Sequence, residues 1–187
     1  DGAERVGQVD LFAHYLAAQF PTFINADDIA RTLTEFPETE RNLIAAERAS
    51  ASRLQLLDER KSFAFETVFS RTGYWLEFIR FAKDRGFRVL ISFLCTEAPA
   101  LNVARVSERV EGGGHSVPAE KVTARYPRSI ETAILAKDLA DELWLYDNSN
   151  LNESPTLAAI FCGPTVEYCG ETVPRWCRRF LEKPGAM

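Results

Sequence analysis

Apolar residues follow two alternating patterns along this chain. Short uninterrupted apolar runs, such as 88–94, are typical of buried strands, and apolar residues spaced three and four apart, as across 38–61, are typical of amphipathic helices. Strands that alternate with helices predict a parallel α/β sheet, because the chain must cross back over the sheet before it can pair in parallel. In chain order we expect a helix over 11–20, a strand at 23–24, helices over 27–36 and 38–61, a strand over 62–70, a helix over 75–82, a strand over 88–94, two helices within 99–129, a last core strand closed by the turn 146–149, strands over 157–161 and 166–169, and a helix over 174–181.

The first predicted strand runs directly into the polar stretch Asn25-Ala26-Asp27-Asp28. Open α/β sheets bind ligands at the carboxyl edge of their strands, so a carboxylate at this point can face a substrate hydroxyl. Asp27 is therefore a candidate general base, which takes a proton from such a hydroxyl. The alternative is that Asp27 and Asp28 only cap the helix that follows, since Asp is common at helix N-caps.

The predicted strand over 62–70 also ends in polar side chains. Glu66 can accept a hydrogen bond from a substrate hydroxyl, and Thr67 or Ser70 can contact a phosphate. The alternative is that these side chains only satisfy a loop, as polar groups at strand ends often do. We expect the carboxylates of Asp27 and Glu66 to converge on one cleft, roofed by arginines from the next segment.

The segment 99–129 carries the basic chemistry of the chain. In its first predicted helix, Arg105 and Arg109 stand four residues apart, on a face next to a stripe of valines. Glycines at 112–114 link this helix to the next, and two arginine-bearing helices joined by glycines suit a hinged lid that closes over phosphates. The alternative is a solvated pair of helices with ordinary surface charges. The second helix carries Lys121, Arg125 and Arg128, and Pro127 is expected to kink it or to end its first half.

Residues 2–9 have the two-glycine frame of a phosphate-binding loop, G-x-x-x-x-G-K-[ST]. Gly2 and Gly7 supply the frame, and we assign them, with Gln8, to nucleotide binding. Gln8 and Val9 stand where such a loop has the lysine that reaches the phosphates and the hydroxyl that holds magnesium. Gln8 carries no charge and Val9 cannot ligate a metal, so the frame is present without its chemistry.

Composition places the chain in the ordinary globular class. Its 187 residues are 46% hydrophobic and 11% aromatic, which is enough for one domain with a substantial core. A net charge of −5 gives no general attraction for nucleic acid or an anionic membrane, and no apolar run approaches the roughly 20 residues that span a bilayer. We expect a cytoplasmic protein with a single domain over 1–187. Because the sequence begins with Asp rather than Met, we expect a processed or truncated form.

The sequence predicts no metal site. His115 has no second ligand at a suitable spacing, so we expect it to form hydrogen bonds within a loop. The cysteines lack the C-x-x-C spacing of a zinc site, and we expect all of them to be reduced. They are Cys95, Cys162, Cys169 and Cys177.

Five short segments stand in order between 21 and about 149: FINADDIA, SFAFETVFSR, ARVSERVEGGGHSVP, ARYPRS and LWLYDNS. In this order and at these separations they resemble the zeta-toxin family of P-loop small-molecule kinases. The resemblance is closer still to the chromosomal, zeta-toxin-like branch that is often described as a predicted ATPase.

The resemblance implies a P-loop-kinase-like fold, with a mostly parallel sheet flanked by helices and an arginine-bearing lid over about 99–129. It implies that ATP and Mg²⁺ serve to transfer a phosphoryl group to a hydroxyl of a small molecule. Characterised toxins of the family phosphorylate the nucleotide sugar UDP-N-acetylglucosamine, and many are held inactive by a small helical antitoxin, which the resemblance implies as a partner.

Position by position, the resemblance makes Asp27 the general base, and Glu66 the acid of the substrate-binding strand end with Thr67 beside it. The turn 146–149 would lie near an adenine. The candidates for lid arginines that contact phosphates are Arg109, Arg125 and Arg128. The expected substrate-binding set is completed by Asn25, Ser70 and Arg105.

The sequence departs from the family pattern at Gln8 and Val9, and the strand that precedes the glycine loop is not part of it. Removing one charged group of this kind lowers transition-state stabilisation by about 3 kcal/mol. Two functions therefore stay open. The first is a small-molecule kinase, and the second is a catalytically impaired family member that binds a nucleotide or a partner through Glu66 and the lid arginines.

Overall fold

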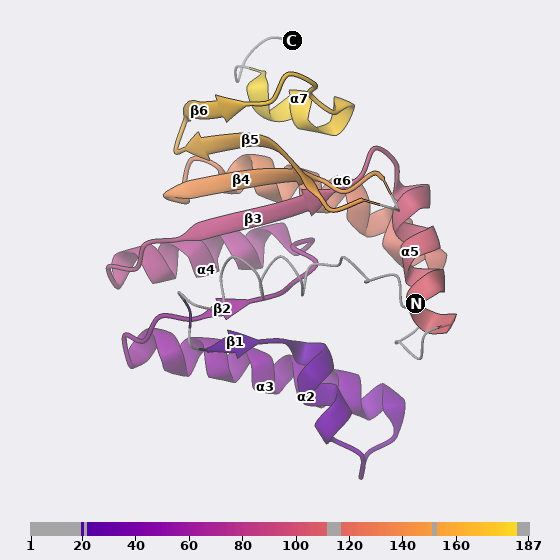
Figure 1. Cartoon of the computed structure of the whole chain (residues 1–187). Helices are drawn as coiled ribbons and strands as arrows, with labels where there is room; N and C mark the ends of the chain where they lie inside the picture. Colours follow the sequence, from indigo (N-terminus) through magenta and orange to yellow (C-terminus); the bar gives the residue numbers. More distant parts are fainter. Residues whose placement is uncertain (1–19, 21, 112–116, 151–152, 183–187) are drawn as a thin grey trace. The chain divides into compact units, whose positions relative to one another are not determined.

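The computed structural model describes residues 20, 22–111, 117–150 and 153–182 (Figure 1). The chain divides into two compact units, which we call unit 1 (up to Thr67) and unit 2 (from Val68). Within the described ranges, no helix is both long enough and apolar enough to cross a membrane. The expectation of a single domain over 1–187 stays a prediction.

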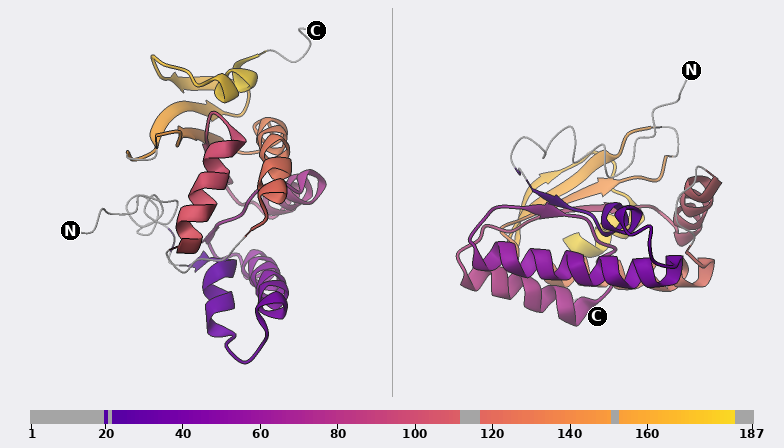
Figure 2. Two further views of the ribbon diagram at one scale, coloured as in Figure 1. Left: turned by 90° about the vertical axis from the view of Figure 1, so that its right-hand side faces the viewer. Right: turned by 90° about the horizontal axis from the view of Figure 1, so that it is seen from below.

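Unit 1 is built on one short parallel strand pair. β1 (Phe23–Ile24) and β2 (Ala64–Phe65) align with Phe23 opposite Ala64 and Ile24 opposite Phe65. Helices α2 (Ala26–Thr32) and α3 (Glu38–Asp58) pack against each other and form the crossover that parallel pairing requires (Figure 2). The core of this unit contains Ile24, Leu33, Ala45, Ala49 and Leu57.

Three elements of unit 1 are shorter than the sequence predicts, and one of them is α3, which was expected over 38–61 and ends at Asp58. The helix expected over 27–36 ends at Thr32, since the chain turns at 34–36 before Pro37 opens α3. The strand expected over 62–70 pairs only at Ala64–Phe65. Phe69, in that same stretch, has a φ of 58°, a left-handed conformation that no strand can include.

Unit 2 holds a four-stranded sheet in the order β3-β4-β5-β6. β3 and β4 are parallel because two helices connect them, whereas β5 and β6 join by a tight turn and pair antiparallel. Gly163 at that turn has a φ of 56°, which glycine adopts without strain. The elements are α4 (Thr72–Asp84), β3 (Leu90–Cys95), α5 (Pro99–Glu111), α6 (Ala119–Ala136), β4 (Glu142–Asp147), β5 (Thr156–Cys162), β6 (Thr165–Cys169) and α7 (Arg175–Leu181).

The core of unit 2 is formed by its central strands and α7. Leu143 and Leu145 of β4 are fully buried. Phe180 of α7 contacts the rings of Phe93, Phe161 and Trp176, with centroid separations of 6.2, 6.4 and 6.2 Å. Aromatic side chains bury large apolar areas and prefer such offset or edge contacts, so this cluster fixes α7 to the sheet.

The strand predicted as buried over 88–94 is fully buried on one face only: Phe93 and Cys95 of β3 are buried, whereas Leu90, on the opposite face, is 37% exposed. Of the two outcomes expected at Pro127, an end of the helix is wrong, because α6 continues through it to Ala136, and a kink stays a prediction. Tertiary packing of the α6 interior, including Ala133, which is fully buried, offsets the backbone hydrogen bond that proline cannot make.

Candidate active site

The N-terminus of α2 is capped by Asn25. Its backbone is extended (φ −122°, ψ 120°), and its Oδ1 accepts a hydrogen bond from the Asp27 N–H at 2.8 Å. An Asn at this position satisfies one of the amides that the first helical turn leaves without a partner. The idea that Asp27 and Asp28 cap the helix is therefore wrong: both lie in its first turn, and Asp28 pairs with Arg31.

Parallel pairing brings the ends of β1 and β2 together. The Glu66 N–H donates to the Ile24 carbonyl at 3.3 Å, and Asn25 Nδ2 donates to Glu66 Oε2 at 3.2 Å. Glu66 and the neighbouring Thr67 are half-buried. Among the site residues proposed from sequence, the structure thus joins Asn25 directly to Glu66 across 41 positions of chain.

Asp27 has a fixed backbone and an open carboxylate. Its N–H is held by Asn25, while the carboxylate is exposed and accepts no hydrogen bond from any residue that the structure describes. A carboxylate without internal donors can take a proton from a hydroxyl brought within about 3 Å. The role of Asp27 as a general base stays a prediction.

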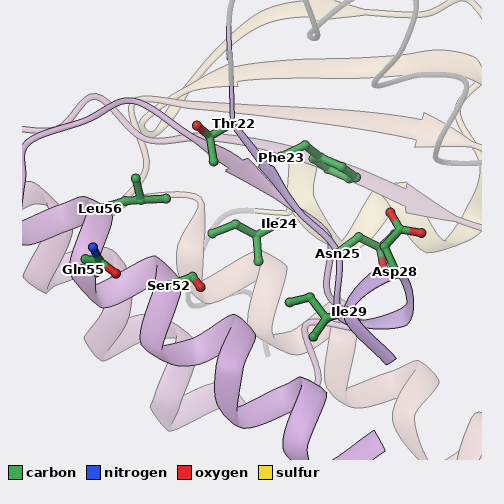
Figure 3. A pocket seen from close by; sticks show the side chains of 9 residues that line it. All are labelled: Thr22, Phe23, Ile24, Asn25, Asp28, Ile29, Ser52, Gln55 and Leu56. Atoms are coloured by element: carbon green, nitrogen blue, oxygen red, sulfur yellow. The ribbon is translucent and has the colours of Figure 1, made fainter. Parts of the chain in front are cut away.

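A pocket of about 360 Å³ adjoins this site, between β1, α2 and α3 (Figure 3). Asn25 and Asp28 form one rim, and α3 supplies the other. Asp27 and Glu66 do not line it, so the pocket neighbours the candidate base rather than containing it. The lining residues are Thr22, Phe23, Ile24, Asn25, Asp28, Ile29, Ser52, Gln55 and Leu56.

A second cluster of polar strand-end residues follows β3 and β4 in unit 2. Asp147 Oδ1 accepts hydrogen bonds from Ser149 Oγ at 2.7 Å and from Trp176 Nε1 at 3.0 Å. Glu97 Oε1 accepts from the Arg175 N–H at 2.7 Å, and the Glu97 N–H donates to Ser149 Oγ at 2.8 Å. The acids at this edge are engaged by donors of their own unit. A nucleotide-binding role for the turn 146–149 stays a prediction.

Arg105, expected to bind substrate, holds the loop after β4. Its Nη2 donates to the Asn148 carbonyl at 2.8 Å, to Asn148 Oδ1 at 3.1 Å and to the Asn150 carbonyl at 3.0 Å. The Asn148 N–H in turn donates to the Cys95 carbonyl at 2.7 Å. This network couples α5 to the ends of β3 and β4.

The other predicted site residues of unit 2 have fewer partners. Arg128 is exposed and donates from Nε to the Ala124 carbonyl of its own helix at 3.0 Å. Arg125 is half-buried, and its guanidinium bonds to no residue within the described ranges. Ser70 is half-buried in the segment before α4. The side chain of Arg109, on α5, lies outside the described part of the chain.

Helix α6 is anchored at the same edge of unit 2. The Tyr126 O–H donates to the Thr96 carbonyl at 2.6 Å, and Ser129 Oγ donates to the Val68 carbonyl at 2.7 Å. Burial raises the pKa of Tyr126, and it raises that of the adjacent Cys95 to about 12. The thiol of Cys95 is therefore protonated and unreactive at neutral pH. The lid over 99–129 stays a prediction.

The nucleotide-binding frame, Gly2, Gly7 and Gln8, lies outside the described residues, as does His115. Within the described ranges, no group of three or more His, Cys, Asp or Glu side chains could hold a metal ion. Val9, in the place of the usual hydroxyl, has no donor atom for magnesium. The use of Mg²⁺ implied by the resemblance stays a prediction. None of the four cysteines takes part in a disulfide bond in the structure, and their expected reduced state stays a prediction.

Arg53 lies in this region and was not predicted from sequence. It lies on α3, is only 8% exposed, and places its guanidinium carbon 5.1 Å from the centroid of the Phe65 ring. Such cation–π contacts strengthen when water is excluded. The signal available in sequence was an arginine on the apolar face of α3, four residues before Leu57.

Comparison with solved structures finds a similar fold in a chain from the PezAT chromosomal toxin-antitoxin system of the human pathogen Streptococcus pneumoniae. The TM-score is 0.55, the match covers 94% of this chain and 72% of that chain, and 9% of the residues are identical. No protein-family model and no curated protein matches the chain. The fold is zeta-toxin-like. The prediction of a P-loop-kinase-like α/β fold is thereby confirmed, and at this identity the likeness shows the fold alone.

Proposed function

We propose that the chain is an ATP-dependent phosphotransferase that acts on a hydroxyl of a small molecule, such as a nucleotide sugar of the UDP-N-acetylglucosamine type. The observation that carries the proposal is the Asp27 carboxylate, which stands exposed at the carboxyl end of a parallel strand pair without a hydrogen-bond donor among the described residues. This is where α/β folds place the groups that act on ligands.

In this proposal each candidate residue has a defined role. Asp27 takes the proton from the acceptor hydroxyl, and Glu66, with Thr67 beside it, binds the acceptor. Guanidinium groups of the predicted lid stabilise the charge that develops on the transferred phosphoryl group. Those groups belong to Arg109, Arg125 and Arg128. Ser70 contacts a phosphate, and Gly2, Gly7 and Gln8 approach the nucleotide through their backbone.

ATP supplies the phosphoryl group in this reaction. Neutral Gln8 can donate a hydrogen bond to a phosphate but cannot offset its charge, which leaves that task to the arginines. Magnesium accompanies ATP in this proposal, and we assign it no protein ligand among the described residues.

The competing proposal is a non-catalytic protein that binds a nucleotide or a protein partner. It is supported by Gln8 and Val9, which lack the charge and the hydroxyl of an active phosphate-binding loop, and by Arg105, whose guanidinium is engaged by the loop after β4. The structural neighbour comes from a toxin-antitoxin system. We therefore propose a small helical antitoxin as the partner of this chain in either case.

Turnover with ATP, magnesium and a panel of nucleotide sugars separates the two proposals. A kinase transfers phosphate, and Asp27→Asn lowers its turnover by about 10²- to 10⁴-fold, the usual contribution of a general base. Glu35→Gln, an equivalent change at an exposed acid after α2, serves as the control and keeps wild-type turnover. Nucleotide binding without turnover supports the binding protein, and the absence of both rejects the two proposals together.

A further inference from the structure

Both the oxygen and the nitrogen of the Asn25 side-chain amide form hydrogen bonds within unit 1. Its Oδ1 accepts from the Asp27 N–H at 2.8 Å, and its Nδ2 donates to Glu66 Oε2 at 3.2 Å. One bond fixes the start of the helix that carries the candidate base, and the other fixes the candidate acceptor-binding carboxylate. An amide engaged in this way is poorly placed to serve as a substrate ligand, which is the role expected for Asn25 from sequence.

Both bonds together require asparagine. Asp and Ser are as good as Asn at a helix N-cap, because each presents an oxygen to the free amides of the first turn. An ionised Asp has no hydrogen to donate, and the single hydroxyl of Ser sits closer to the backbone. Only Asn combines the capping oxygen with an N–H donor that reaches Glu66 Oε2.

The strand pair itself gives Glu66 little support. β1 and β2 are two residues long, and the backbone bonds that flank them run from the Ala64 N–H to the Thr22 carbonyl (2.9 Å) and from the Glu66 N–H to the Ile24 carbonyl (3.3 Å). A pair this short is marginal without additional contacts. The backbone bond holds Glu66 at the end of β2, and the side-chain bond from Asn25 acts on its carboxylate.

We propose that Asn25 is a positioning residue, whose amide ties the Glu66 carboxylate to the N-terminus of the helix that bears Asp27. The inference rests on the proposed function, since it assigns the relative placement of the base and the acceptor-binding acid to this one side chain. It replaces the substrate-binding role of Asn25 with a structural one inside the site.

We call the hydrogen bond from Asn25 to Glu66 the tether. Exchanging its donor and acceptor by mutation tests it without any assay of activity. Asn25→Asp keeps the cap but sets two carboxylates against each other, and we expect it to lower the folding equilibrium constant about tenfold at low salt. Adding Glu66→Gln restores the pair with donor and acceptor exchanged, and we expect the double variant to return to within about twofold of wild type. Urea unfolding of the two single variants and the double variant gives these values.

Two results would overturn the tether. One is an Asn25→Asp variant as stable as wild type, which a purely capping role predicts. The other is a double variant whose loss is the product of the two single losses. Asn25→Ser is a second, less disruptive variant, because it keeps the cap and removes the donor without adding charge. If Asn25→Asp does not fold alone while the double variant folds, the reversal itself has rescued the protein and the tether holds.

Kinetics then separate this inference from the proposed function. In an active protein, Asn25→Ser raises the KM for the acceptor by about fivefold with a smaller change in kcat, whereas Asp27→Asn lowers kcat. If the wild type is inactive but the double variant regains stability in urea unfolding, the kinase proposal is refuted and the positioning role of Asn25 stands. An active wild type with independent single losses refutes the tether and keeps the kinase.

Discussion

The two parallel strand pairs of this protein both end in carboxylates, which differ in the hydrogen bonds they receive. After β3 and β4, Asp147 receives two hydrogen bonds and Glu97 receives one, all from residues of unit 2. After β1 and β2, Glu66 receives a bond from Asn25, while the Asp27 carboxylate receives none from the described residues. We call the first the closed edge and the second the open edge.

An acid at the end of a strand is therefore not by itself evidence of a catalytic or binding role. In both places the sequence reads as a strand followed by polar residues, and in both the backbone delivers a carboxylate to the carboxyl edge. The closed edge supplies internal donors, including an indole N–H and a serine hydroxyl, that satisfy its acids. The acid that remains unsatisfied is the one available to a substrate.

The largest effect is expected from opening the closed edge at Arg105. Arg105→Met keeps much of the side-chain volume but removes three hydrogen bonds to the loop after β4, so we expect a loss of about 2 kcal/mol in the free energy of unfolding. Arg128→Met is the control, since among the described residues its exposed guanidinium bonds only to its own helix, and it should change stability by about 0.5 kcal/mol or less. Equal losses in chemical denaturation would show that Arg105 does not hold this edge.

A smaller effect is expected at the opposite end of the same strand pair, at Asp141. Burial alone would raise the pKa of Asp141, but bonds from Lys83 Nζ (2.5 Å) and the Val89 N–H (2.7 Å) outweigh it and hold that pKa below its usual value. A lowered carboxyl pKa stabilises the fold above the unfolded value, and this stabilisation is lost as the pH falls through the folded value.

Asp141→Asn should therefore remove about 1 kcal/mol or less at pH 7, a figure reduced for the partial exposure of the pair. The difference between the variant and the wild type should shrink as the pH falls below about 4. Urea unfolding at several pH values measures it. A difference that grows toward acid would mean that the Asp141 carboxylate does not act as a satisfied structural acid.

The smallest structural effect is expected from thiol modification. Cys95 ends β3 directly beneath the closed edge, and burial raises its pKa and that of Cys177 to about 12. At pH 8 iodoacetamide should modify the exposed Cys162 and Cys169 first, and their modification should leave the unfolding midpoint unchanged. Peptide mass spectrometry over time gives the order. Early labelling of Cys95 in the folded protein would show that the edge is not closed.

Much of the fold could be predicted because its signals are local. The alternation of apolar runs and helical repeats located nearly every strand and helix, and the polar residues after the strands marked both edges. The predictions that were wrong, the cap of α2 and the end of β2, depend on the surroundings of single residues. Asn25 and Asp27 are equally good caps by type, so their assignment depended on where the helix begins. The end of β2 depended on tertiary context that sequence does not display.

The partners at the two edges could not be predicted, because they are far apart in the chain. Arg105 lies 43 positions from Asn148, and Asn25 lies 41 positions from Glu66. From sequence, both Arg105 and Asn25 were expected to bind substrate. In the structure, each is bonded to the end of a strand. Residue type and spacing suggested which side chains could bind a ligand. Only the contacts in the structure show which of them are already hydrogen-bonded within the protein.

The most direct test of the contrast compares Asp27→Ala with Asp147→Ala in urea unfolding at physiological salt. Asp147→Ala leaves the Trp176 N–H and the Ser149 hydroxyl without their acceptor, so we predict a loss of about 2 kcal/mol. Asp27→Ala should change the free energy of unfolding by about 0.5 kcal/mol or less, because that exposed carboxylate has only the screened helix dipole to stabilise it. Equal losses, or a larger loss for Asp27→Ala, would contradict the distinction between an open and a closed edge.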